Sequence, residues 1–157
     1  MFSHTGNITS MGFQKDGKWL FTGSEDGTIK LWDLRAKGPQ REYDNKVPVN
    51  AVALHPNQAE LLFGDHNGQA QVLDLASNKV SFCEQKEGDV PIRSVATSSD
   101  GTVFVAANNS GNCYLWDPSS PHARYALFPG MFSGMFTGIF TGIFPGPRRS
   151  TRGGGRR

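Results

Sequence analysis

The four histidines are the first residues to test for chemistry, because imidazole can bind metals and move protons near neutral pH. They stand at positions 4, 55, 66 and 122. No two of them have the spacing of an HExxH motif or of another metal-binding pair. Asp65 and His66 are adjacent, but they fall in a turn where short polar residues are expected in any case. The histidines therefore predict neither a catalytic site nor a metal site.

Other catalytic signatures are also missing from the sequence. There is no GxSxG elbow, no P-loop and no GxGxxG after a strand, and the glycine-rich end lacks the Lys-Ser/Thr pair of a phosphate cradle. We therefore expect a protein with no catalytic residues, no cofactor and no metal. Cys83 and Cys113 stand apart without a CxxC pair, which favours two buried thiols in a reducing compartment over a disulfide. Polar residues follow Met1 where a signal peptide would be apolar, so we expect a cytoplasmic protein.

The charge is divided unevenly along the chain. Residues 1–147 hold 11 Lys and Arg against 14 Asp and Glu, whereas residues 148–157 hold five Arg and no acid. The basic balance therefore belongs to the C-terminal end, and no nucleic-acid partner is expected for the body of the chain.

Three segments repeat one pattern, in which a tight turn on a glycine precedes a short apolar run that ends in Asp. The turn glycines Gly27, Gly68 and Gly111 are 41 and 43 residues apart. The three segments are His4–Asp33, Val49–Asp74 and Ile92–Asp117.

Alternating apolar residues between turn signals predict four short strands in each repeat. The predicted strands are 8–13, 19–24, 28–33 and 40–43; 49–54, 60–64, 69–74 and 80–84; and 92–97, 102–107, 112–116 and 122–127. No segment has a helical period with capping signals. A period in the low forties with four strands is typical of propeller blades, so we expect an all-β, partial β-propeller.

These segments resemble WD repeats. In that family a His before the inner strand, a Ser or Thr on the second strand, an Asp in the tight turn and a Trp on the third strand form a buried polar chain. The resemblance implies this structural role for His4, Thr22, Asp26 and Trp32 in the first repeat.

The other two repeats depart from the family pattern. The second has Asn45 at the His position, Asn67 at the turn Asp and Leu73 at the Trp, whereas the third has Gly88, Ser110 and Trp116. These departures leave the chain of hydrogen bonds in doubt for both repeats, but not the fold.

The segments also resemble, in the same order, repeats of the WD-repeat subunits of the target-of-rapamycin kinase complexes. The most specific match is LHPNQAEL at 54–61, because WD repeats commonly place Pro-Asp-Gly at that turn. The resemblance implies a non-catalytic scaffold that binds and stabilises the kinase catalytic domain. A generic WD-repeat adaptor is the alternative. Turns on one rim carry side chains that packing does not require, so Glu25, His66 and Asn109 are candidate partner contacts.

The sequence codes for about three of the seven blades that the resemblance implies. We expect a partial propeller over 1–127, with repeats at about 4–44, 45–87 and 88–127, and a tail over 128–157. Bare blade faces would favour self-association or a covering partner. A truncated gene product without independent function is the other interpretation.

The tail repeats Phe and Gly every four residues and then ends in an Arg- and Gly-rich run. We expect a low-complexity, disordered extension. A membrane helix over 125–147 is an alternative, because the stretch is uncharged and has GxxxG spacing, but its five glycines and Pro129 weaken a helix. An RNA-binding arm is a third possibility for the arginines.

Overall fold

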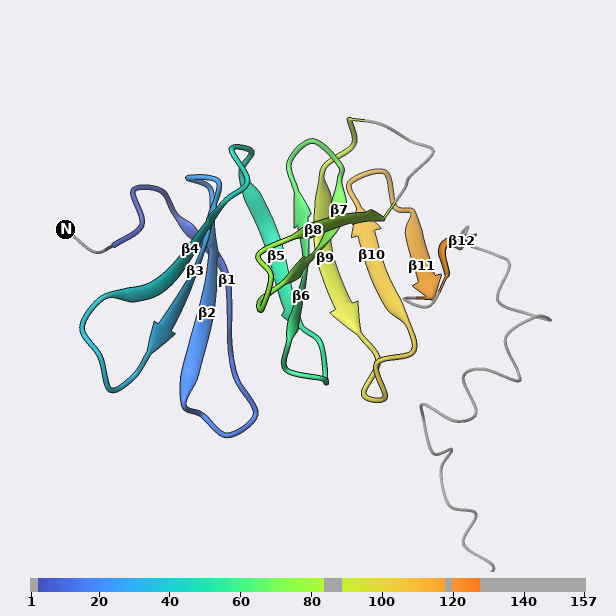
Figure 1. The fold of residues 1–157 in the computed structure, drawn as a ribbon. Coiled ribbons are helices and arrows are strands. Elements are labelled where there is room, and N and C mark those ends of the chain that lie inside the picture. The colour runs from blue at the N-terminus through green and yellow to red at the C-terminus, as the bar shows by residue number, and fades with distance from the viewer. Residues whose placement is uncertain (1–2, 84–88, 118–119, 128–157) are drawn as a thin grey trace, which may run out of the picture.

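The computed structural model describes residues 3–83, 89–117 and 120–127, and within them every regular element is a strand (Figure 1). The strands form three four-stranded sheets. The first sheet comprises β1 (Ile8–Phe13), β2 (Trp19–Ser24), β3 (Thr28–Asp33) and β4 (Pro39–Asp44). The second comprises β5 (Val49–Leu54), β6 (Glu60–Asp65), β7 (Ala70–Asp74) and β8 (Val80–Cys83). The third comprises β9 (Ile92–Thr97), β10 (Phe104–Asn108), β11 (Cys113–Asp117) and β12 (Ser120–Leu127). The predicted all-β class with three four-stranded blades is confirmed.

Each sheet is an antiparallel meander, because each strand pairs with the next strand in the chain. Gly27 and Gly68 have φ angles of 84° and 82°, in the left-handed region that glycine adopts without a steric cost. A Cβ atom at Gly68 would also lie 2.6 Å from the carbonyl oxygen of Val90. At Gly27 and Gly68 the glycine is therefore required both by backbone angle and by the chain that passes beside it, whereas at Gly111, with φ of 82° and no atom within 4 Å, only the backbone angle requires it.

Strand β10 begins at Phe104, two residues later than the sequence predicted for this strand. The backbone N–H and the hydroxyl of Thr102 donate to the Asp100 carboxylate at 3.0 and 2.8 Å. A further hydrogen bond from the Ser98 hydroxyl is the main reason why the pKa of Asp100 is lowered to about 2. Because the ionised carboxylate holds Thr102 in the turn, pairing with the neighbouring strands starts only after it.

The three sheets are stacked face to face, so the second sheet is covered on both sides (Figure 1). Successive residues of a strand point to opposite faces. Leu61 and Phe63 of β6 pack in the core shared with the first sheet, and Leu62 between them packs in the core shared with the third. Apolar residues in unbroken succession are therefore buried in β6, as expected for a strand with no solvent face.

Two glycines at equivalent positions let the sheets approach closely. A Cβ atom at Gly23 of β2 would lie 2.6 Å from Val52, and one at Gly64 of β6 would lie 2.2 Å from Ile92. The inner strand of the following sheet occupies the space that a side chain would need. The same small residue thus sets the stacking distance at both junctions.

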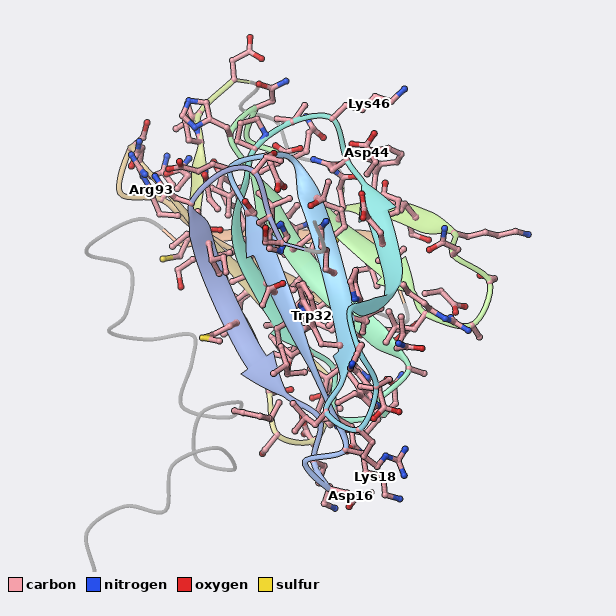
Figure 2. All side chains as sticks on the ribbon, turned by 90° about the vertical axis from the view of Figure 1, so that its left-hand side faces the viewer. Asp16, Lys18, Trp32, Asp44, Lys46 and Arg93 are labelled. Carbon is pink, nitrogen blue, oxygen red and sulfur yellow. The ribbon has the colours of Figure 1, made fainter. Side chains whose placement is uncertain are left out.

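The first sheet has one face that no other described sheet covers, and Figure 2 looks onto it. In β1, Met11 and Phe13 pair with Thr22 and Leu20, on the side away from the second sheet. Met11 is 63% exposed and Phe13 62% exposed, and Ile8 in the same strand is 54% exposed. The exposed side chains of β1 therefore include large apolar residues, as expected for a blade face that no other described sheet covers.

The tail and parts of the third repeat lie outside the described residues. These comprise the Phe/Gly repeat and the Arg-rich end (128–157), most of the alternative membrane segment, and Gly88. A membrane-crossing helix is not found among the residues that the structure describes. Of the two cysteines, Cys83 is buried as predicted, whereas Cys113 is only half-buried.

Candidate functional site

The four polar residues singled out in the first repeat are joined by hydrogen bonds. The Trp32 indole N–H donates to the Thr22 hydroxyl at 2.8 Å, and His4 Nε2 lies 2.7 Å from the same oxygen. His4 Nδ1 lies 2.9 Å from the Asp26 carboxylate. Since Asp26 needs a donor, Nδ1 carries the imidazole proton and the Thr22 hydroxyl donates to Nε2. The chain of donors thus runs from Trp32 to Asp26 and ties β2, β3 and the segment before β1 together.

Asp26 ends this chain as an ionised carboxylate. Burial alone would raise the pKa of its carboxyl group. The hydrogen bonds from the hydroxyl and backbone N–H of Thr28, from the backbone N–H of Thr5 and from His4 outweigh it and hold this pKa below the usual value of 3.8. The charge is therefore kept at neutral pH by the donors that surround it.

An Asp, a His and a hydroxyl in series have the connectivity of a nucleophilic triad, so this arrangement has to be tested as a catalytic site. A nucleophile must be reachable by substrate. Thr22 is only 3% exposed, and its oxygen already accepts the Trp32 indole N–H. The His4 side chain is 2% exposed. The geometry therefore suits a structural link and offers no accessible nucleophile.

The second sheet has a polar cluster of its own, which sequence reasoning missed. Gln71 Nε2 donates to Asp65 at 3.0 Å and to Asn45 at 3.2 Å, and the Asn45 amide donates to Asp65 at 3.3 Å. Asp65 and Gln71 are both buried. Of the positions aligned by the family pattern, Asn45 takes part through its side chain and Asn67 only through its backbone N–H, which donates to Asp65 at 3.0 Å. The sequence did contain a signal for this cluster, because Asp65 and Gln71 are polar residues next to the apolar runs of β6 and β7.

The third sheet leaves its tryptophan unsatisfied. Trp116 is 2% exposed, and its indole N–H has no hydrogen-bond partner among the described residues. In the repeat alignment, Ala106 occupies the place that Thr22 holds in the first sheet, so the accepting hydroxyl is missing. Ser110, aligned with the turn Asp, is exposed and only donates its backbone N–H to Asn108. The alignment of the repeats therefore already indicated, through Ala106, that the Trp116 indole lacks its hydroxyl acceptor.

The three candidate contact residues lie on one edge of the stack, at the upper turns of Figure 1. Glu25, His66 and Asn109 stand in the β2–β3, β6–β7 and β10–β11 turns and are exposed. The backbone N–H of each donates to a carbonyl in the segment before the inner strand of its own sheet, at 2.9, 2.9 and 3.0 Å. The accepting residues are Asn7, Pro48 and Pro91.

The side chains of these three residues are engaged differently. Glu25 accepts a hydrogen bond from Asn7 at 2.8 Å, and Asn109 accepts one from Arg93 at 2.5 Å. The repeated backbone bond nevertheless fixes all three turns in the same way. The edge therefore presents three exposed polar side chains from rigid positions.

The opposite edge contains the LHPNQAEL turn, which contacts both neighbouring sheets. Gln58 Oε1 accepts the backbone N–H of Lys15 in the first sheet at 2.9 Å. His55 Nδ1 accepts the Asn57 N–H, so Nε2 carries the proton and donates to the carbonyl of Gly101 in the third sheet at 3.1 Å. Gln58 adopts a left-handed conformation with φ of 62°, which is uncommon for a residue with a side chain. The turn thus links the second sheet to both of its neighbours through side-chain hydrogen bonds.

None of the described residues forms a group of three or more His, Cys, Asp or Glu that could hold a metal ion. The hydrogen-bonded polar side chains described above lie within the three sheets and in their turns. The described residues thus present two polar edges, one carrying Glu25, His66 and Asn109 and the other carrying the LHPNQAEL turn.

Comparison with known proteins finds one matching family model and several similar relatives. The model of the family described as "WD domain, G-beta repeat" matches residues 1–33 and 78–117, which leaves much of the second sheet unmatched. "Protein LST8 homolog" of Dictyostelium discoideum is 56% identical over 72% of this chain and 37% of its own length. "Target of rapamycin complex subunit wat1" of Schizosaccharomyces pombe is 50% identical over 72% of this chain and 36% of its own. "Non-functional target of rapamycin complex subunit LST8-2" of Arabidopsis thaliana is 49% identical over 73% of this chain and 36% of its own. The chain spans about a third of the length of these curated relatives.

Proposed function

The chain is a WD-repeat protein that spans about a third of the length of its curated relatives, and from this premise we propose that it acts as a non-catalytic scaffold of a target of rapamycin complex. Its partner would be the catalytic domain of the kinase, which it would bind and stabilise. The observation that carries the proposal is identity of about half over 72% of this chain, with relatives named as a subunit of such a complex or as an LST8 homologue.

The turn edge with Glu25, His66 and Asn109 is the surface that we assign to the partner. All three residues are exposed and stand at equivalent turns, and the backbone of each turn is fixed by the same hydrogen bond. A rigid scaffold that holds polar loop residues outward is a common design for binding. Such an edge needs no rearrangement before a partner docks, so less conformational entropy is lost on binding.

The polar chain supports a scaffold role over an enzymatic one. Its hydroxyl and imidazole are buried and already hydrogen-bonded, so they stabilise the first sheet and cannot reach a substrate. The function then depends on surface shape and on the rigidity of the stack.

Co-purification with the kinase tests the proposal. The tagged chain is co-expressed with a target of rapamycin kinase, and recovered kinase is quantified. We expect recovery with the unchanged chain and a clear loss when Glu25→Ala, His66→Ala and Asn109→Ala are combined. A matched variant at the opposite edge, with Asp16→Ala, Lys18→Ala and Lys37→Ala combined, should retain the kinase. Failure to recover kinase under conditions in which a full-length relative does would contradict the proposal.

A chain without independent function is the second candidate. One observation favours it, because a relative that is 49% identical carries the printed name of a non-functional subunit. The same experiment separates the two, since such a chain would recover no specific protein. A generic WD-repeat adaptor would instead recover partners unrelated to the kinase, which mass spectrometry of the bound fraction would identify.

A further inference from the structure

A groove lies between the first and second sheets, at the edge that carries the LHPNQAEL turn. Its volume is about 520 Å³, within the range of about 300–1,000 Å³ that is usual for ligand sites. One wall comes from β2, β3 and β4 of the first sheet, and the other from the β5–β6 and β7–β8 turns of the second. The groove is thus built where two sheets meet, away from the turn edge assigned to the kinase.

The floor of the groove is apolar. Trp19, Leu31 and Leu75 line it, and all three are partly buried side chains packed against the core between the two sheets. The groove therefore exposes part of the apolar core between the first and second sheets to solvent. A bulky apolar side chain from a partner would extend the same core and remove apolar area from water.

The mouth of the groove presents a cation that no carboxylate of the described residues neutralises. Arg41 is exposed and donates one N–H to the carbonyl of Leu75, which holds the guanidinium across the groove. Guanidinium has five N–H donors, so most remain available. Among the described residues, no carboxylate lies within ion-pair distance of Arg41.

The acid at the same groove is already engaged. Asp33 accepts hydrogen bonds from the side chain and the backbone N–H of Arg35, and the side-chain bond is the main reason why its pKa is lowered. Lys15 and Lys18 are exposed in the turn that precedes Trp19, and Lys18 is labelled at the lower edge in Figure 2. Of the two charged residues that line the groove among the described residues, Asp33 is thus paired with Arg35, and Arg41 alone has no ion-pair partner.

We propose that this groove binds a short acidic peptide segment, with a bulky apolar side chain on Trp19, Leu31 and Leu75 and an adjacent carboxylate on Arg41. An apolar floor beside a pre-positioned guanidinium fits this combination, since carboxylates pair with guanidinium in a bidentate manner. Gln58 holds the second-sheet wall in place through its bond to Lys15. This assigns a binding role to the LHPNQAEL turn, separate from the kinase contact.

Fluorescence anisotropy with a defined probe tests the proposal on the full chain. The probe is a labelled ten-residue peptide with a central Leu-Phe pair and two glutamates on either side. Two control peptides replace the glutamates by glutamines or the Leu-Phe pair by Ala-Ala. We expect saturable binding of the first peptide and at least a roughly tenfold weaker affinity for each control, because each lacks one of the two recognised groups.

Variants of the chain locate the site. Arg41→Gln should weaken the probe about tenfold, whereas Lys46→Gln, an exposed cation on the opposite edge labelled in Figure 2, should leave binding unchanged. Ala59→Trp fills the groove from an exposed position and should abolish binding while the circular dichroism spectrum stays that of the unchanged chain.

Several results would overturn the proposal. These are no binding of the first probe at about millimolar concentration, equal binding of the glutamine peptide, or binding that Arg41→Gln and Ala59→Trp leave unchanged. Sedimentation that shows self-association lost in Ala59→Trp would assign the groove to a second copy of the chain instead.

Discussion

Trp32 in the first sheet and Trp116 in the third occupy the same position of the third strand, but the two sheets hold them by different means. Trp32 is half-buried, and its indole N–H donates to Thr22 at 2.8 Å. Trp116 is 2% exposed, and its N–H has no partner among the described residues. Ala106 stands where Thr22 stands in the first sheet.

The comparison shows that the tryptophan of the third strand can be held in position either by hydrogen bonds or by packing. Where no described sheet covers the tryptophan, a chain of hydrogen bonds holds it. Where the neighbouring sheet covers it, packing in the core cluster that includes Leu62 and Phe104 is sufficient even though the N–H is unsatisfied. An unsatisfied buried donor costs about 1–3 kcal/mol, which burial of a large aromatic side chain can offset.

The largest expected effect is therefore at Trp116. Trp116→Ala should lower the free energy of unfolding by about 3–5 kcal/mol, because it opens a cavity between two sheets. Trp32→Ala should cost less, about 2 kcal/mol, since it loses a hydrogen bond and only partial burial. Urea denaturation followed by circular dichroism measures both. An equal or larger loss at Trp32 would reverse the comparison.

Thr22→Val tests the hydrogen-bond side of the comparison without changing side-chain volume. The change removes the group that joins Trp32 to His4 and leaves the indole N–H and the imidazole Nε2 without this partner, so the expected cost is about 1–3 kcal/mol. Thr5→Val is the matched control, because Thr5 is exposed and should change stability by less than about 0.5 kcal/mol. If both variants unfold at the same urea concentration, the chain of bonds contributes no stability.

Asp26 gives the first sheet a pH dependence that can be isolated. Its pKa in the folded chain is below the ordinary value of 3.8, so the unfolded chain binds the proton more readily. The carboxylate therefore stabilises the fold above about pH 4, and this contribution is lost as the pH falls through the lowered value. Asp26→Asn should cost about 1 kcal/mol at pH 6 and show a shallower loss between pH 5 and pH 2 in urea titrations. Parallel curves for the two proteins over that range would rule out this role.

The smallest expected effect is a gain. Ala106→Ser places a hydroxyl at the position that Thr22 holds in the first sheet. Ala106 lies on the same face of β10 as Phe104, which pairs with Trp116. Satisfying the indole N–H should raise the free energy of unfolding by about 0.5–1 kcal/mol. Thermal unfolding detects it as a higher Tm, and Val105→Ser on the other face of the same strand is the control. A lower Tm for Ala106→Ser would mean that the junction has no room for the oxygen.

Much of the fold could be predicted from local sequence. Alternating apolar residues located the strands to within about two residues, and the turn glycines located the repeats, because side-chain direction and backbone angle depend on the residues themselves. The polar chain of the first repeat came from family resemblance. Its hydrogen-bonded pairs are 10 to 22 residues apart, and only folding places them within hydrogen-bond distance.

By itself, the sequence determined the strands, the turns, the repeat and the class of repeat. The tertiary structure alone decided that Asp65 and Gln71 meet inside the second sheet, that Gln58 reaches the first sheet and His55 the third, and that Arg41 lies over an apolar groove. The physical reason is that a strand pattern fixes which face a side chain takes, whereas its partner is fixed by the register between strands and by the stacking of sheets. Apart from Asp65 and Gln71, which are six residues apart, these contacts join residues at least 34 positions apart in the chain, and no local pattern encodes them.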